Sequence, residues 1–340
     1  MKKFRCFGAA AMFTLAAAAA PAATDQSTLV VTASNATNNQ LLVYNSTGQM
    51  LQAVGTQGKG GVSGNAGGVV ARGGMVAVVN FGSQNVSIFE RRGNGMQMHD
   101  LIPAASSPVS VAFGESHLYI LGTTKVESHR IYGDTYVSSA PDGVVTLLKA
   151  DASAAQVGVV ANQLIITEKS NTIETVNLMP DGSVGGTPTL VLNIPSNVDA
   201  PFGLVTRGNN AYVTIAHADE VSLVRNSKVL TVTGSGTEHS PCWATLVGPF
   251  LYTANSPSKS VSRFAVYGQK IVQDLAVAAQ FAGNPTDIDS GGGLVAVIDS
   301  AGTLTRLSVF DVDEDGNLTQ RGIATINAVT NGVAVVRSGR

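Results

Sequence analysis

The chain has 340 residues, with 21 Lys and Arg against 23 Asp and Glu and a formal net charge of −2. Charged residues make up only 13% of the sequence and form no basic stripe. This composition excludes a nucleic-acid partner, which would require clustered Lys and Arg.

Residues 1–23 have the pattern of a secretory signal peptide. Three basic residues among the first five precede an apolar, Ala-rich run, and small residues follow where cleavage would occur. Removing those three charges leaves 18 Lys and Arg against 23 Asp and Glu in residues 24–340, a net charge of −5. No later stretch reaches the roughly 20 apolar residues of a spanning helix, so we expect a periplasmic or secreted protein without membrane insertion. Cys242 is then the single cysteine, and we expect it to be a buried small residue rather than a nucleophile.

Residues 24–340 alternate short β-branched runs with turns rich in Gly, Asn, Ser and Asp, a pattern typical of many short strands. One unit recurs seven times: an apolar strand, a polar turn of about five residues and a second strand. The first apolar residues after these turns lie 40 to 48 residues apart, at Leu41, Val86, Val126, Ile173, Val221, Val261 and Leu304. The sequence therefore predicts an all-β, seven-bladed β-propeller with four-stranded antiparallel blades, forming one domain. A solenoid is the alternative, but it would need capping ends.

The two ends of the domain complement each other. Residues 331–336 have the pattern of the first strand of a unit, whereas the N-terminal unit begins directly at its second strand, 28–32. We therefore expect the C-terminal strand to pair into the N-terminal blade and close the ring.

The repeat also predicts which turns share a face. In an up-and-down blade with strands a to d, the b–c turns and the connections from strand d to the next strand a lie on one face. Loops around a channel form a concave site on a rigid scaffold, so this is the candidate functional face. The residues predicted to bind a small polar ligand there are Asn35, Asn80, Asn255, Asn284 and Asp287. The three turn asparagines could instead cap their own turns, and Asp287 could form structural hydrogen bonds.

Glu168 lies in the b–c turn of the fourth unit and is the candidate catalytic acid or base. Partial burial at a channel mouth would raise its pKa, although a solvated turn carboxylate beside Lys169 is the alternative. His239 and His217 belong to the same face and could polarise a carbonyl or activate water, or could serve only as hydrogen-bonded structural residues. We predict that Glu168 points toward the channel, with an imidazole or a turn asparagine within a ligand's width.

Metal and cofactor motifs are weak. Asp311-x-Asp313-x-Asp315-Gly resembles the start of a calcium loop, but the twelfth position is Gly322 instead of Glu, and an Asp-Gly hairpin explains the same residues. The sequence has no phosphate-binding Gly loop, His-Glu-x-x-His motif or Gly-x-Ser-x-Gly elbow. We predict no metal site and no cofactor.

Several motifs resemble the lactonase-type seven-bladed propellers, which include bacterial 6-phosphogluconolactonase and the carboxymuconate cyclases. They are the units AYVTIAH, LYTANSP and VAVVNFG, the hairpins PDGSV and DEDGNL, and the segments HSPCW and GNPTDI. Thr167-Glu168 followed by Thr172-Ile173 matches the spacing of the turn that carries the family's catalytic Glu, with Thr in place of Asn. The family's Arg-His pair corresponds here to residues 153–156, and its Arg in the next blade corresponds to His217.

Together with the signal-peptide pattern, the resemblance implies an exported lactonase-like enzyme that acts on a small lactone, ester or sugar acid. Opening a lactone requires a group that stabilises oxyanion charge, and this chain lacks the family's cations at the matching positions. The alternative is a non-catalytic propeller that binds a ligand or an envelope protein partner. The fold alone does not distinguish the two functions.

Overall fold

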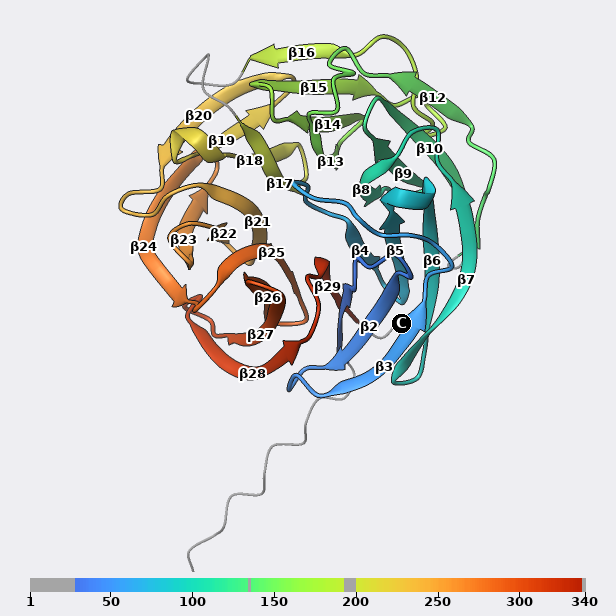
Figure 1. The fold of residues 1–340 in the computed structure, drawn as a ribbon. Coiled ribbons are helices and arrows are strands. Elements are labelled where there is room, and N and C mark those ends of the chain that lie inside the picture. Colours follow the sequence, from blue (N-terminus) through green and yellow to red (C-terminus); the bar gives the residue numbers. More distant parts are fainter. Residues whose placement is uncertain (1–27, 134–135, 193–199, 338–340) are drawn as a thin grey trace, which may run out of the picture.

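The computed structural model describes residues 28–133, 136–192 and 200–337; the predicted signal peptide lies outside them. Seven antiparallel sheets surround a central channel, as Figure 1 shows, which confirms the predicted seven-bladed propeller. The described residues form two short 3₁₀ helices, η1 (Phe81–Ser83) and η2 (Ala216–Ala218). None of their helices is long and apolar enough to cross a membrane.

Each blade is given from the channel outward. Blade 1 consists of β29 (Asn331–Val336), β1 (Leu29–Ala33), β2 (Gln40–Asn45) and β3 (Met50–Gly55), and blade 2 of β4 (Val69–Arg72), β5 (Met75–Asn80), β6 (Asn85–Arg92) and β7 (Gly95–Pro103). Blade 3 contains β8 (Pro108–Phe113), β9 (His117–Gly122), β10 (Lys125–Tyr132), β11 (Tyr136–Val137) and β12 (Gly143–Thr146). Blade 4 consists of β13 (Ala154–Val160), β14 (Gln163–Glu168), β15 (Thr172–Asn177) and β16 (Thr189–Leu192).

The remaining three blades follow the same order. Blade 5 consists of β17 (Pro201–Arg207), β18 (Asn210–Ile215), β19 (Glu220–Arg225) and β20 (Lys228–Gly234), and blade 6 of β21 (Pro241–Val247), β22 (Phe250–Asn255), β23 (Ser260–Tyr267) and β24 (Lys270–Gln280). Blade 7 consists of β25 (Asn284–Gly291), β26 (Leu294–Ala301), β27 (Leu304–Val312) and β28 (Leu318–Ile326). All seven anchor residues of the sequence repeat lie in third strands, as the spacing predicted.

Burial follows a strand's place in its blade. The second strands β1, β5 and β9 are buried at every residue, because neighbouring blades pack against both faces of each. This explains their near-continuous apolar sequences. The outer strand β3 has exposed and half-buried residues instead, in a largely alternating pattern.

The ring closes through β29. It pairs antiparallel with β1, from Leu29 opposite Val336 to Thr32 opposite Val333, which confirms the predicted closure. Val333 and Val335 belong to an apolar cluster shared with blade 7, whereas Val336 belongs to a cluster shared with blade 2. The last strand therefore joins three blades.

Blade 3 departs from the simple four-strand pattern. Its outermost strand is broken, because β11 pairs with the end of β10 and β12 pairs with its beginning. Residues 138–142 leave the sheet between these two strands. At the end of this excursion, the carboxylate of Asp142 accepts a 2.6 Å hydrogen bond from Ser128 Oγ in β10.

Candidate functional site in the central channel

A long connection covers the channel on the predicted functional face. Residues 56–68, between β3 and β4, are here called the crossing loop; Figure 1 shows this blue segment extending inward toward β17. Its Asn65 side chain donates a 2.6 Å hydrogen bond to the carbonyl of Val109 in blade 3, and its Ala66 amide donates a 3.1 Å bond to the carbonyl of Ala155 in blade 4. The loop is thus fixed to blades beyond those that it connects.

Trp243 completes the closure from the opposite side of the ring. It lies in β21 of blade 6, and its indole Nε1–H donates to the carbonyl of Asn65 at 3.1 Å. Asn331 of β29 donates to Asn65 Oδ1 at 2.9 Å. The ring of Phe202 packs edge-on against Trp243, with centroids 5.4 Å apart. Asn65 and Trp243 therefore form a floor across the channel.

On the a–b turn side of this floor, the channel contains a cavity of about 540 Å³. The innermost strands of all seven blades contribute to its lining, from Trp243 and Ala66 at the floor to Arg72 and Glu115 near the a–b turns. The cavity thus reaches the face opposite the one that the sequence predicted. Its volume is within the range of small-molecule sites.

Two carboxyl groups on β25 line the cavity. Asp287 accepts hydrogen bonds from the amides of Ile288 at 2.9 Å and Val333 at 3.0 Å, and burial raises its pKa to about 8. Asp289 accepts from the Val335 amide at 2.8 Å, and burial raises its pKa to about 6. Burial therefore favours the protonated form of Asp287 more strongly than that of Asp289.

The other polar side chains of the lining come from five different blades, with Glu115 as the contribution of blade 3. Gln156 of β13 accepts a 2.6 Å hydrogen bond from the Leu204 amide, which holds its side chain across two blades. Thr206 and Thr245 contribute hydroxyl groups to the same lining. Near the rim, Arg72 donates to the carbonyls of Gly114 and Glu115, so a positive charge is fixed close to the a–b turns.

Asp287 is the one predicted ligand residue that belongs to this lining. Among the described residues, the others lie elsewhere: Asn80 and Asn255 are fully buried in side-chain hydrogen-bond networks. Asn80 accepts from Asn39 of blade 1 and donates to Ser87, whereas Asn255 donates to Ser260 and Ser262 of its own blade. Asn35 has a φ of 53° and accepts hydrogen bonds from the amides at positions 61 and 62. Asn284 is exposed at the start of β25.

Glu168 is fully buried at the end of β14, outside the lining of the cavity. Its Oε2 accepts a 2.7 Å hydrogen bond from Ser153 Oγ, whereas its Oε1 has no hydrogen-bond partner. Burial raises its pKa to about 8. It shares one face of β14 with Leu164 and Ile166, because the three residues are spaced two apart. The apolar cluster of Leu164 and Ile166 includes blade 3, so Glu168 faces the space between two blades. The adjacent Lys169 donates to the Gly64 carbonyl of the crossing loop at 2.7 Å.

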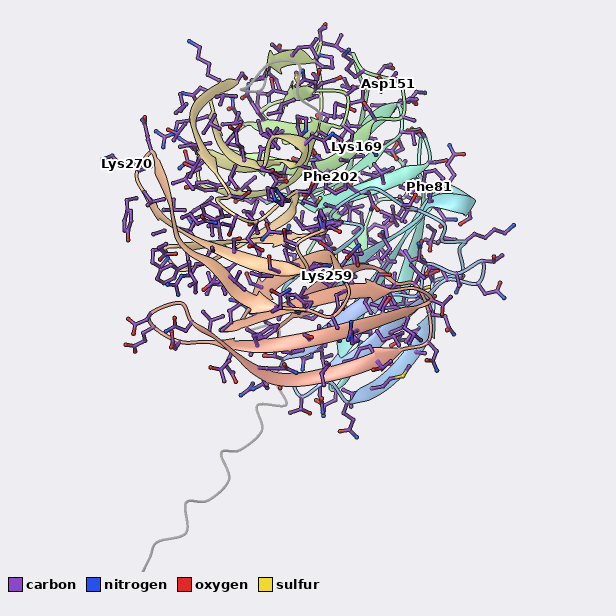
Figure 2. All side chains as sticks on the ribbon, turned by 60° about the vertical axis from the view of Figure 1, so that its left-hand side comes forward. Phe81, Asp151, Lys169, Phe202, Lys259 and Lys270 are labelled. Atoms are coloured by element: carbon purple, nitrogen blue, oxygen red, sulfur yellow. The ribbon has the colours of Figure 1, made fainter. Side chains whose placement is uncertain are left out.

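The two predicted imidazoles are exposed on the b–c turn face. His239 Nδ1 lies 2.8 Å from Asp219 Oδ2, and this hydrogen bond raises the pKa of His239. His217 lies in η2, in the same turn as Asp219. Neither residue forms a hydrogen bond with Glu168 in the described structure. Figure 2 shows Phe81, Lys169 and Lys259, from three different b–c turns, around this side of the ring.

The remaining candidates have structural surroundings. Burial raises the pKa of Cys242 to about 12, so its thiol stays protonated. Asp313 accepts hydrogen bonds from the Asn317 backbone at 2.7 Å and from its side chain at 3.0 Å, as an Asp-Gly hairpin does. Within the described ranges, no group of three His, Cys, Asp or Glu residues could hold a metal ion.

One feature of the sequence, separate from the blade repeat, indicated that a loop could close the channel. The crossing loop has 13 residues, whereas the connection between β7 and β8 has four. A connection of that length with many glycines can extend past the two blades that it joins and contact others. Gly67 illustrates why: a Cβ there would lie 2.9 Å from Ser110 Oγ in blade 3 and 3.2 Å from Gln156 Nε2 in blade 4.

No protein-family model matches this sequence, and no curated protein sequence matches it. Similar folds are found among solved structures. A protein of unknown function from Desulfotomaculum acetoxidans has a TM-score of 0.67 at 13% identity, over 92% of this chain and 99% of that one. A Bacteroides fragilis protein provisionally named a 6-phosphogluconolactonase has a TM-score of 0.66 at 14% identity, over 93% and 100% of the two chains.

A streptogramin B lyase has a TM-score of 0.60 at 13% identity, over 80% of this chain and 87% of that one. At these identities the likeness shows a shared propeller fold, including the fold of proteins named lactonases. It does not carry an activity from one chain to another.

Proposed function

We propose that this chain is an exported, lactonase-like propeller that binds a small polar molecule of the lactone, ester or sugar-acid class in its channel cavity. The observation that supports binding is the cavity of about 540 Å³, closed at one end by Asn65 and Trp243 and lined by polar groups. Export is supported by the signal-peptide pattern of residues 1–23. The ligand enters from the a–b turn face.

The lining selects the chemistry of the ligand. A protonated Asp287 offers an O–H donor, and Gln156, Thr206 and Thr245 add neutral polar groups. The carboxylate of Asp289 disfavours a phosphate deep in the cavity. Arg72 near the rim can pair with a single carboxylate. A hydroxylated lactone or a sugar acid therefore fits better than a phosphorylated sugar.

The test uses Trp243, the single tryptophan of the chain, as a fluorescent reporter at the floor. We expect a saturable change in its emission when sugar lactones and sugar acids are titrated into the mature protein, with the same affinity by calorimetry. Thr206→Phe should fill the cavity and weaken binding at least tenfold. Thr206→Val is the matched control, because it keeps the shape of the side chain and loses only one hydroxyl group. It should weaken the binding free energy by no more than about 1 kcal/mol.

Two results would overturn the proposal. One is a panel of lactones, esters and sugar acids that gives no saturable signal by either method. The other is binding that Thr206→Phe leaves unchanged while its melting temperature matches that of Thr206→Val, because the ligand would then lie outside the cavity.

Hydrolysis in the same cavity is a second candidate function, supported by the pair of carboxyl groups on β25. Asp289 would take a proton from water, whose oxygen attacks the carbonyl carbon of a lactone. As the ring C–O bond breaks, Asp287 would protonate the leaving oxygen, which yields a hydroxy acid. Acid release from the panel, measured by pH-stat, should then be maximal between about pH 6 and 8. Binding without acid release, unchanged in Asp289→Asn, would leave binding as the whole function.

A further inference from the structure

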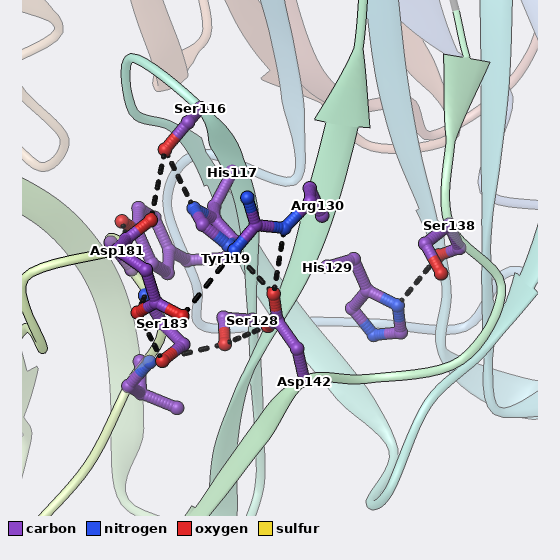
Figure 3. Close-up of polar contacts among 12 residues, drawn as sticks. Ser116, His117, Tyr119, Ser128, His129, Arg130, Ser138, Asp142, Asp181 and Ser183 are labelled. Atoms are coloured by element: carbon purple, nitrogen blue, oxygen red, sulfur yellow. Dashed lines mark hydrogen bonds and ion pairs between the residues drawn. The ribbon is translucent and has the colours of Figure 1, made fainter.

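A Ser–His–Asp hydrogen-bond chain lies outside the channel, between blades 3 and 4. Ser116 and His117 form the a–b turn of blade 3 and the start of β9, and Asp142 precedes β12. Ser116 Oγ lies 2.8 Å from His117 Nδ1, and His117 Nε2 lies 2.7 Å from Asp142 Oδ2. Figure 3 shows the three side chains in this order.

The acceptors determine where the protons are. Asp142 Oδ2 is a carboxylate oxygen, so His117 Nε2 carries the hydrogen of that bond. The neutral imidazole therefore has an unprotonated Nδ1, which accepts the hydroxyl hydrogen of Ser116. The other partner of Ser116 Oγ, the carbonyl of Asp181, is 3.5 Å away and is the weaker acceptor. This is the protonation state that a general base needs in order to activate a serine.

The surroundings hold His117 and Asp142 in place. The His117 side chain is fully buried, and its ring stacks on Tyr119 with centroids 6.1 Å apart. Asp142 Oδ1 accepts from Ser128 Oγ at 2.6 Å, and Arg130 Nε lies 3.7 Å from Asp142 Oδ2. Each carboxylate oxygen thus has a hydrogen-bond donor, which keeps the carboxylate aimed at the imidazole.

Ser116, in contrast, is half-buried and lines a second cavity of about 390 Å³. Val159, Leu178, Met179 and Pro180 give this cavity an apolar side. Asn162 lines it as well and offers an amide donor. The cavity adjoins the channel cavity, because Glu115 and Val159 line both.

The hairpin of blade 4 is shaped around the serine and the histidine. Gly182 has a φ of +91°, and a Cβ on it would lie 2.8 Å from Ser116 Oγ and 2.7 Å from His117 Nδ1. The Tyr119 hydroxyl donates to the Gly182 carbonyl at 2.7 Å, which fixes the hairpin in this position. Only glycine leaves room for both side chains here.

We infer that Ser116 is the nucleophile of a second, hydrolytic site, which cleaves esters that carry a small apolar acyl group. Ser116 Oγ attacks the ester carbonyl carbon and transfers its proton to His117 Nδ1. As the C–O bond to the alcohol breaks, that proton moves to the leaving alkoxide, and the acyl group stays on Ser116. Water then attacks the acyl carbon and gives its proton to Nδ1, which returns it to Ser116 Oγ, so ester and water become acid and alcohol.

Asn162 lines this cavity, and we assign its side-chain amide the role of stabilising the oxyanion, because side-chain amides perform this role in other hydrolases. The acyl group would lie against Leu178 and Met179. This activity is independent of ligand binding in the channel, since neither Ser116 nor His117 lines that cavity.

The experiment treats the mature protein with a fluorophosphonate probe, followed by peptide mass spectrometry. We expect one labelled residue, Ser116, together with hydrolysis of p-nitrophenyl butyrate. Ser116→Ala should lose both signals and keep its melting temperature and its Trp243 fluorescence titration, because it removes one hydroxyl group outside the channel. An unlabelled Ser116, under conditions that label a reference serine hydrolase, would overturn the inference.

Asp142→Asn tests the positioning role of the carboxylate. An amide at position 142 can donate to Nε2, and the ring hydrogen of His117 then moves to Nδ1. A protonated Nδ1 can no longer accept the hydrogen bond from Ser116. Labelling should then slow by about 10²- to 10⁴-fold, and its pH profile should differ from that of the wild type. The charged and titratable groups around His117 are Asp142, Arg130, Asp181 and Tyr119. Equal labelling rates and pH profiles in the variant and the wild type would contradict the role of the imidazole as the base.

Discussion

Closure by β29 predicts a large loss of stability when that strand is shortened. Deleting residues 333–340 removes Val333, Val335 and Val336, whose exposed fractions are 2%, 6% and 0%. Burial of three valines contributes about 5–9 kcal/mol, at roughly 1.5–3 kcal/mol each. The deletion also exposes the edge of β1 and removes the two amides that donate to Asp287 and Asp289. This loss is comparable with the whole stability of a typical domain, about 5–15 kcal/mol.

The assay is thermal unfolding of the mature chain followed by circular dichroism. We expect the truncated protein either to remain unfolded or to melt at least about 10 °C lower, since 1 kcal/mol corresponds to about 2 °C in a chain of this size. A protein lacking only residues 338–340 is the control, because it keeps the whole of β29. Melting of the longer truncation within a degree or two of this control would refute the closure argument.

Two further predictions concern buried groups near the channel. The raised pKa of Glu168 means that the folded chain binds this proton more tightly than the unfolded chain, so its contribution to stability is lost as pH rises from about 4.5 to about 8. Glu168→Gln should remove that part of the pH dependence in urea titrations; an unchanged slope would show that Glu168 does not titrate in this range. Trp243→Phe should cost about 1–3 kcal/mol, because it leaves the Asn65 carbonyl without the indole donor. A urea midpoint equal to that of the wild type would mean that the floor holds without this bond.

The blade architecture could be predicted because its signals are local. A polar turn followed by an apolar residue marks the start of each third strand, so Leu41 and Leu304 located their strands from the sequence alone. The closure could be predicted for the same reason, since residues 331–336 have the pattern of an innermost strand. The break in the outer strand of blade 3 could not, because it depends on hydrogen bonds from Ser128 and His117 to Asp142.

The candidate site was harder to predict because it depends on the direction in which each side chain points from its strand. Asp287 was expected to line the channel and lies in the lining of its cavity, since the first strands of all blades surround the axis; its role as a ligand residue stays a prediction. Glu168 was expected to point toward the channel, but side chains of a second strand stand perpendicular to a sheet that runs outward from the axis. They point at the neighbouring blades, and Glu168 follows Leu164 and Ile166 in this respect. Its role as an acid or base stays a prediction.

The crossing loop explains why the position of the cavity cannot be predicted from the propeller fold alone. A propeller channel has two mouths, and a blade repeat does not specify which of them is open. Here Asn65 and Trp243 close the mouth at the b–c turns, and the described cavity extends from this floor toward the a–b turns. A ligand in that cavity meets side chains of the innermost strands rather than residues of the b–c turns. Recognition then depends on Asp287, Asp289 and Gln156, which also hold neighbouring blades together, so ligand binding and ring stability should be coupled.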